Sequence, residues 1–117
     1  MIWVAGPAAL VVAKLIKIGE RFDAQDRVRD KDALDLFRIL QTVPTGQLAA
    51  GLVLVGDDAT ASDVTAEALG VLNELFTTAD AAGIEMTIRA AGTPAASETI
   101  RASMVILTTD LIDAVNV

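Results

Sequence analysis

The chain has 117 residues, 53% of them hydrophobic and 3% aromatic, and its net charge at pH 7 is −7. This length suits one domain that buries about two thirds of the surface its unfolded form exposes, and two independent domains are not expected. Without cysteine or histidine, the chain has no disulfide, no thiol chemistry and no histidine to act as a base or metal ligand.

The charge is unevenly distributed along the chain. Seven of the nine basic residues and six of the sixteen acidic residues precede position 39, whereas Arg89 and Arg101 accompany ten carboxylates in the remainder. A broad nucleic-acid surface needs clustered Lys and Arg, so nucleic acid is not expected as a partner. No run reaches the roughly 18 apolar residues of a membrane span, and the N-terminus lacks the charge order of a signal peptide. We therefore expect a cytoplasmic protein without membrane contact.

The first third of the chain predicts a pair of helices. Ile2–Ala5 is β-prone and stops at Gly6-Pro7, so it is either a terminal strand or a frayed terminus whose Trp3 packs on the helices. A helix that is apolar almost all round follows from Pro7 to Ile18. After a polar turn at 23–30, Asp30 or a neighbour caps a second helix, which runs to about Thr42 and ends at Val43-Pro44. Its inward residues would be Leu34, Phe37 and Leu40.

The remaining segments also have mainly helical periodicity. Thr45 is expected to cap a helix at about 47–55, although its Leu-Val-Leu-Val segment also fits a buried strand. Thr60-Ala-Ser-Asp63 has the form of a capping box, and 77–83 would be a linker before a short helix at 84–91. After a break at 92–94, the last helix starts near Ser97. The buried stripes would comprise Val64, Ala68, Val71, Leu72, Leu75 and Phe76, and then Ile100, Met104, Leu107, Leu111 and Val115.

These patterns predict an all-α fold, a single bundle of five or six helices with a short N-terminal strand as an addition. Residues 7–42 would be the core helix pair of this one domain, and 45–117 the tail of the bundle. Because so many residues are aliphatic, we also expect a buried interface with a second copy or another protein.

Few motifs in the sequence carry recognisable chemistry. The eight glycines form no phosphate-binding loop, and Gly51-Leu-Val-Leu-Val-Gly56 lacks the Lys-Ser/Thr that such a loop requires. Asp57-Asp58 has the composition of an Mg²⁺ ligand pair, but two adjacent carboxylates in a turn are more often a solvated cap. No catalytic residue and no metal ligand is predicted.

Lys14 is the most informative charged residue. With Lys17 and Arg21 it follows helical spacing on an otherwise apolar helix, so its ammonium either reaches outward or meets an anion. That anion is either a phosphate or a carboxylate. In the second case, Lys14 and Lys17 form ion pairs with Asp32, Asp35 or Glu20, and these pairs fix the crossing of the two helices.

Residues 7–40 resemble a known family. The run Pro-Ala-Ala-Leu-Val-Val-Ala-Lys-Leu-x-Lys-Ile-Gly-Glu-Arg, a charged gap, and Arg-x-Lys-Asp-Ala-Leu-Asp-Leu-Phe-Arg-Ile-Leu are similar to the segment after the catalytic sheet of bacterial nucleotidyltransferase-fold proteins, close to the abortive-infection toxins. The resemblance implies that Lys14 contacts nucleotide phosphates and that Asp32 supports the site. Lys17 and Arg21 would assist in binding, and Asp35 would be a further supporting residue.

The family's metal-binding motif, a Gly-Ser followed by two aspartates on a strand, is missing before Pro7. Metal ions stabilise the charge in phosphoryl transfer, so the chain should not catalyse it alone, and Mg²⁺ with a nucleoside triphosphate is expected only if a missing half is supplied. Residues 1–6 would then be the remnant of a lost sheet. The competing hypothesis is a non-enzymatic interaction module, either a homodimer or a toxin-antitoxin partner, in which the same charges are structural.

Overall fold

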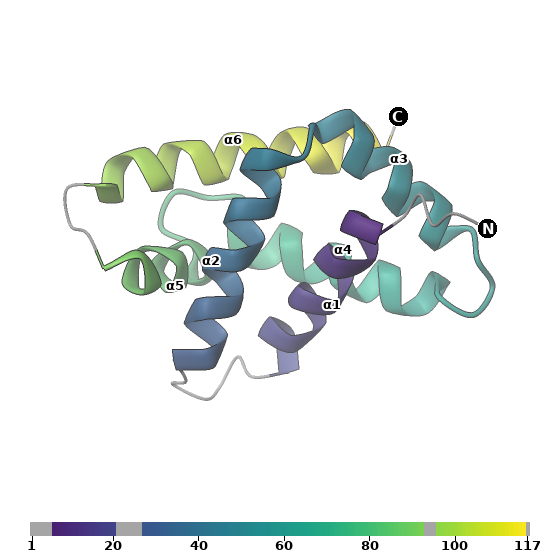
Figure 1. Ribbon diagram of the computed structural model, residues 1–117, viewed down its shortest axis with the longest axis horizontal. Helices are drawn as coiled ribbons and strands as arrows, with labels where there is room; N and C mark the ends of the chain where they lie inside the picture. The colour runs from purple at the N-terminus through teal and green to yellow at the C-terminus, as the bar shows by residue number, and fades with distance from the viewer. Residues whose placement is uncertain (1–5, 21–26, 93–95, 117) are drawn as a thin grey trace.

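Six α-helices make up the fold in the computed structural model, which describes residues 6–20, 27–92 and 96–116 (Figure 1). They are α1 (Gly6–Glu20), α2 (Arg27–Thr42), α3 (Thr45–Gly56), α4 (Ser62–Phe76), α5 (Ala82–Ala91) and α6 (Ser97–Val115). No strand occurs in these residues, which confirms the predicted all-α bundle. The segment that also fitted a strand is α3, a helix. The predicted strand at Ile2–Ala5, Trp3 and Arg21 lie outside the described residues.

The two halves of the chain pack against each other helix by helix. The main partner of α1 in the second half is α4, that of α2 is α5, and that of α3 is α6. In Figure 1, α6 runs along one long edge of the molecule, while α1 lies over α4 and α2 lies beside α5. The result is a body of 42 × 27 × 24 Å.

The centre of the core is the inner face of α1, which packs on α2, α3 and α4. Val11, Leu15 and Ile18 on this face are fully buried, together with Leu36 of α2 and Leu72 of α4. Burying each aliphatic side chain of this size contributes about 1.5–3 kcal/mol, so α1 supplies much of the hydrophobic stabilisation. The apolar helix predicted from Pro7 to Ile18 is α1.

Several predicted helix starts are wrong by a few residues. Helix α2 begins at Arg27, so Asp30 lies in its first turn, where a negative charge interacts favourably with the helix dipole, and is not the cap. Pro44, not Thr45, is the N-cap of α3, and its carbonyl accepts hydrogen bonds from the amides of Gln47 and Leu48. Helix α5 begins at Ala82, which shortens the predicted linker.

The capping box predicted at Thr60 is also absent. Helix α4 starts at Ser62 with Ala61 as N-cap and no side-chain cap hydrogen bond. The Thr60 hydroxyl and amide both donate to the Asp58 carboxylate instead, at 2.7 and 2.8 Å. This local turn uses the side chain that would otherwise have capped the helix.

Two of the predicted buried stripes need correction. Val64 is exposed and Val71 is only partly buried, because the inner face of α4 is centred on Thr65, Ala68 and Leu72. On α6, Leu107 is partly exposed while Thr108 is fully buried. Burial of Thr108 is tolerated because its hydroxyl lies within 2.8 Å of two carbonyl oxygens, that of Met104 and that of Phe76 at the end of α4. Val115 is likewise only partly buried.

Gly83 allows α5 to turn tightly against the end of α4. A Cβ atom at this position would lie 2.5 Å from the Leu75 carbonyl oxygen and 2.6 Å from the Phe76 ring. The Phe76 side chain is fully buried and cannot move aside easily. Glycine is therefore required here for close approach. At the other end of α5, Gly92 closes the helix with φ of 68°.

Gly83→Ala should lower the free energy of unfolding by about 1–3 kcal/mol or more, because the added methyl overpacks a rigid part of the core. Urea denaturation followed by circular dichroism measures the change. Gly70→Ala is the matched control, since Gly70 is exposed inside α4 and a Cβ added there would have no atom within 4 Å. It should stabilise the protein by about 0.5–1 kcal/mol through helix propensity. Equal effects of both variants would contradict the close approach of α5 to α4.

Candidate functional site

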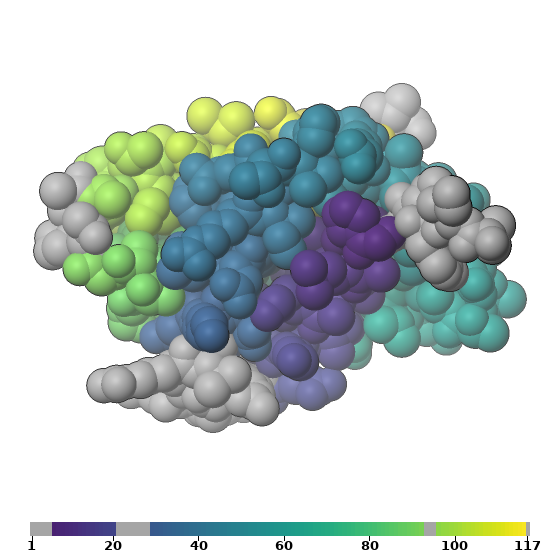
Figure 2. Space-filling view, viewed as in Figure 1, coloured from purple at the N-terminus to yellow at the C-terminus, as the bar shows by residue number. Residues whose placement is uncertain are grey.

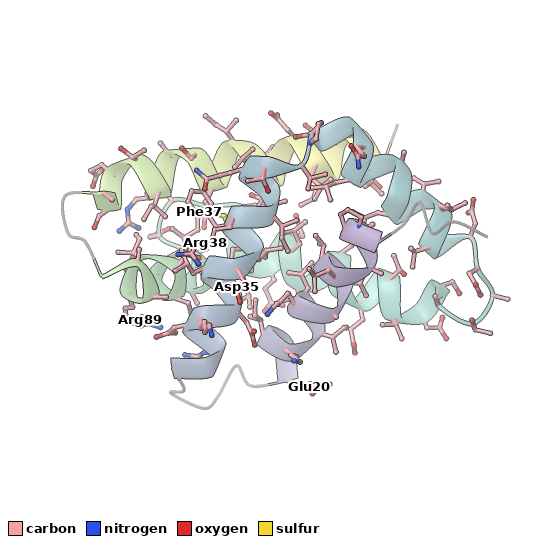
Figure 3. The ribbon with its side chains drawn as sticks, viewed as in Figure 1. Glu20, Asp35, Phe37, Arg38 and Arg89 are labelled. Carbon is pink, nitrogen blue, oxygen red and sulfur yellow. The ribbon has the colours of Figure 1, made fainter. Side chains whose placement is uncertain are left out.

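The cluster of Lys14, Asp32 and Asp35 lies between α1 and α2. The Lys14 ammonium is 2.9 Å from Oδ1 of Asp32 and 3.1 Å from Oδ2 of Asp35, and it donates a hydrogen bond to each. Figure 3 shows Asp35 on α2, on the side that faces α1. The side chains of Lys14, Asp32 and Asp35 are 19%, 7% and 28% exposed. The structure thus brings together three of the five residues predicted for the site.

Helix geometry explains why these three residues meet. Asp32 and Asp35 are three residues apart, so both carboxylates lie on one side of α2. Lys14 lies on the flank of α1 next to its fully buried residues Val11 and Leu15, which places its alkyl chain along the core. The hydrogen bond that Lys14 donates to Asp32, together with the bond to Asp35 and the two negative charges, raises the pKa of Lys14 above 10.5, and burial lowers this pKa by less. Lys14 is therefore held in its charged form.

The other predicted binding residues do not join this cluster. Lys17 is exposed on the outer side of α1, one turn further along, and Arg21 lies outside the described residues. Arg38, labelled in Figure 3, approaches the second oxygen of Asp35 at 3.9 Å from the solvent side. The predicted row of cations along one helix is thus divided between the α1–α2 contact and solvent.

The cluster is a poor phosphate site as it stands. The ammonium and the two carboxylates alone sum to a net charge of −1, and Arg38 meets Asp35 only from the solvent side. A phosphate approaching Lys14 therefore also meets two anions within about 3 Å of its ammonium. The buried Oδ2 of Asp32 has no hydrogen-bond partner in the described part of the chain. An acceptor of this kind attracts a donor or a cation and repels phosphate oxygens.

Sequence analysis missed a second interhelical ion pair, between Arg89 of α5 and Asp30 of α2. Its two hydrogen bonds measure 3.1 and 3.0 Å, with Nε and Nη2 donating to separate carboxylate oxygens. Asp30 raises the pKa of the Arg89 guanidinium. An open hollow of about 670 Å³ adjoins the pair and also touches Lys31 and Leu34. Because the two residues are 59 positions apart, no sequence spacing indicated the contact.

Asp57 and Asp58 are exposed in the turn after α3, where Asp57 is the C-cap of the helix, as expected for a solvated cap. Asp58 accepts hydrogen bonds from the hydroxyl and amide of Thr60, and these hold the pKa of its carboxyl below the usual value. Within residues 6–20, 27–92 and 96–116, no three potential acidic ligands come close enough to hold a metal ion.

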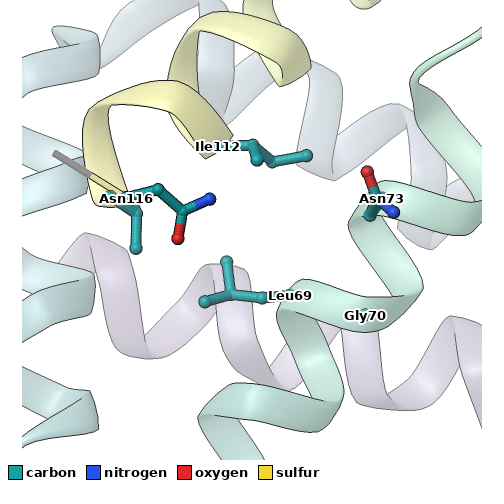
Figure 4. A pocket seen from close by; sticks show the side chains of 6 residues that line it. Leu69, Gly70, Asn73, Ile112 and Asn116 are labelled. Atoms are coloured by element: carbon teal, nitrogen blue, oxygen red, sulfur yellow. The ribbon is translucent and has the colours of Figure 1, made fainter.

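A smaller pocket of about 320 Å³ lies between α4 and the end of α6 (Figure 4). Figure 4 shows the carboxamides of Asn73 and Asn116 on opposite sides of the hollow, with Leu69 and Ile112 between them. No ionisable side chain lines it. The pocket therefore offers no acid, base or nucleophile for catalysis.

None of the described helices alone is long and apolar enough to cross a bilayer. Arg29–Thr42 and Thr45–Gly56 meet the length and composition requirement only as a pair, and the chain bends by 115° between them.

Comparisons with protein-family models, with curated proteins and with solved structures find no match to this chain. The nucleotidyltransferase resemblance thus depends on the sequence between residues 7 and 40 alone, and it stays a prediction.

Lys14→Met should lower the free energy of unfolding at pH 7 by about 2–4 kcal/mol, because it leaves two carboxylates at the α1–α2 contact without their partly buried partner. The difference in free energy of unfolding between wild type and Lys14→Met should depend on pH. Since folding raises the pKa of Lys14, its contribution is complete below pH 10.5 and is lost as the pH rises through the folded-state pKa. Urea denaturation of both proteins from neutral to alkaline pH measures the difference.

Lys17→Met is the matched control, because Lys17 is exposed on the same helix. This change should alter stability by no more than about 0.5 kcal/mol. Two results would contradict the structural role of Lys14. One is an equal loss of stability in Lys14→Met and Lys17→Met, and the other is a stability difference between wild type and Lys14→Met that grows above pH 10.5.

Proposed function

We propose that this chain is a non-enzymatic helical module that acts through a protein contact, with its Lys14 cluster serving the fold. The observation that carries the proposal is the position of the Lys14 ammonium, within 3.1 Å of two carboxylates from another helix. A lysine held in this way fixes the crossing of α1 and α2. The two carboxylates already balance its positive charge, so its attraction for a phosphate is weak.

The other interhelical ion pairs support the same interpretation. Arg89 joins α5 to Asp30 of α2 through two hydrogen bonds. Arg101 of α6 lies 2.8 Å from Glu85 of α5 and donates a hydrogen bond to the carbonyl of Ala79 before α5. These cations connect helices of the bundle to one another. Each has a carboxylate of its own, so neither offers a phosphate an unpaired charge.

The nucleotide hypothesis leads to a different expectation. If the chain is the accessory half of a nucleotidyltransferase-like protein, Lys14 would exchange Asp32 and Asp35 for phosphate oxygens, with Lys17 and Arg21 assisting. This hypothesis is supported by the resemblance of residues 7–40 to nucleotidyltransferase-fold proteins. The closed cluster opposes it, because phosphate would have to displace two carboxylates that are already in place.

Calorimetric titration of the full chain with ATP and GTP, each with and without Mg²⁺, tests the proposal. We expect no saturable heat from any of the four titrations, because the Lys14 cluster carries a net negative charge. The interaction-module proposal is overturned by saturable triphosphate binding that disappears in Lys14→Met and persists in Lys17→Met. Circular dichroism of the two variants, recorded under the same conditions, shows whether any loss of binding reflects loss of folding.

A further inference from the structure

The outer side of α3 and that of α1 before Lys14 form a surface without charged residues. We call it the α1/α3 face and define it by exposed residues of the two helices: Ala9, Leu10, Ala13, Ala50, Val53 and Leu54. Leu10, Val53 and Leu54 are 47%, 44% and 48% exposed. They are three of the five large hydrophobic side chains that are exposed in the described part of the chain.

The composition of the two helices is unusual for an exposed surface. No charged residue occurs anywhere in α3, nor in α1 before Lys14. A surface helix normally has a polar side facing water, and an apolar side in that place indicates a covered surface. The centres of protein interfaces are depleted of charge in the same way.

The two helices contribute to one continuous surface. Helices α1 and α3 pack against each other. In Figure 2, the atoms of α1, in purple, and those of α3, in dark teal, adjoin on the side of the molecule that faces the viewer. Exposed residues of the two helices can therefore be covered together by one partner.

We propose that this face binds the same face of a second copy of the chain, which gives a two-fold symmetric dimer. Charge favours this partner over others. A copy carries the same net charge of −7 and is repelled by acidic surfaces such as those with Asp63 and Glu67 of α4 or Asp110 and Asp113 of α6. The residues that define the α1/α3 face carry no charge that would repel it. A basic partner would gain its attraction at the acidic surfaces instead, and gains nothing from charge at this one.

The rim of the face has charges that suit two-fold pairing. Lys17 is exposed on α1 beyond Ala13, with Glu20 exposed one turn further along, and Asp57 is exposed just after the end of α3. Figure 1 shows the end of α1 directed away from the end of α3, so these charges border the face at separate ends. A two-fold axis through the face brings opposite ends together, so that Lys17 of one copy approaches Asp57 of the other.

The area required is compatible with the molecule. A specific interface covers about 800 Å² on each partner, or roughly one eighth of an accessible surface of 6524 Å². Pairing four helices in this way is a common arrangement for helical proteins.

The inference depends on the proposed function, since it names the protein partner of the module. Sedimentation velocity of the full chain over a range of concentrations tests it. We expect wild type to sediment at twice its mass of 12.2 kDa. Leu54→Glu should raise the dimer dissociation constant by about 30-fold or more, because it places a carboxylate at the centre of an apolar contact. Its circular dichroism spectrum should be unchanged, since Leu54 is half exposed.

Ile106→Glu is the matched control. Ile106 is 59% exposed on α6, outside the face, so this variant should dimerise like wild type. The inference is overturned if wild type is monomeric at every concentration, or if Ile106→Glu dissociates the dimer while Leu54→Glu does not. A monomer in which Leu54→Glu shifts the emission of Trp3, the single tryptophan, would show that the N-terminal segment covers the face instead.

The outcomes also separate this inference from the proposed function. A monomeric chain that binds no triphosphate overturns the dimer and leaves the interaction module standing. Triphosphate binding that requires Lys14 overturns the module, whatever the oligomeric state.

Discussion

The ammonium of Lys14 is held where α1 meets α2, beside an otherwise aliphatic core. An ion in that position requires counter-charge, and Asp32 and Asp35 supply it at 2.9 and 3.1 Å. Helix α2 also carries Asp30, which binds Arg89 of α5. Residues two positions apart are about 200° apart around a helix, so Asp30 and Asp32 point to opposite sides of α2. One short acidic run thereby joins α2 to two different helices.

These ion pairs affect which arrangement of the helices forms, as well as how stable that arrangement is. A buried ion pair often adds little to the free energy of unfolding compared with a well-packed apolar pair. Separating the two charges, however, is strongly destabilising. Sliding or rotating α1 against α2 would separate Lys14 from its carboxylates while leaving aliphatic side chains in contact. In a core of Ala, Val, Leu and Ile with few aromatic residues, many packings have similar energy. The ion pairs distinguish one helix arrangement from the others.

The same distribution of charge shapes the outer surface. Lys14, Arg89 and Arg101 form interhelical pairs that hold α1, α2, α5 and α6 together. The outer sides of α4 and α6 remain acidic, and the α1/α3 face remains uncharged. The chain thus presents surfaces of two kinds, one that repels a second copy and one that does not. This contrast is the basis for proposing that a second copy binds at the α1/α3 face.

Local sequence patterns predicted the helices well, because helical periodicity and breaks such as Val43-Pro44 are local properties. Helix starts were less predictable: Thr60 had the spacing of a cap, yet it hydrogen-bonds Asp58. The proximity of Lys14 and Asp32 was predictable from two facing charged stripes. The pairing of Arg89 with Asp30, and the burial of Thr108 against Phe76, were not, because they depend on how the two halves of the chain pack. Nothing local encodes that arrangement.

A double-mutant cycle between Lys14 and Asp32 tests the central claim most directly. The free energy of unfolding would be measured for wild type, Lys14→Met, Asp32→Leu and the double variant. If the pair fixes the contact of α1 with α2, the double variant should be more stable than the sum of the single changes implies, with a coupling energy of about 1–3 kcal/mol. Additive single effects, with a coupling energy near zero, would contradict the account and leave Lys14 available for a ligand.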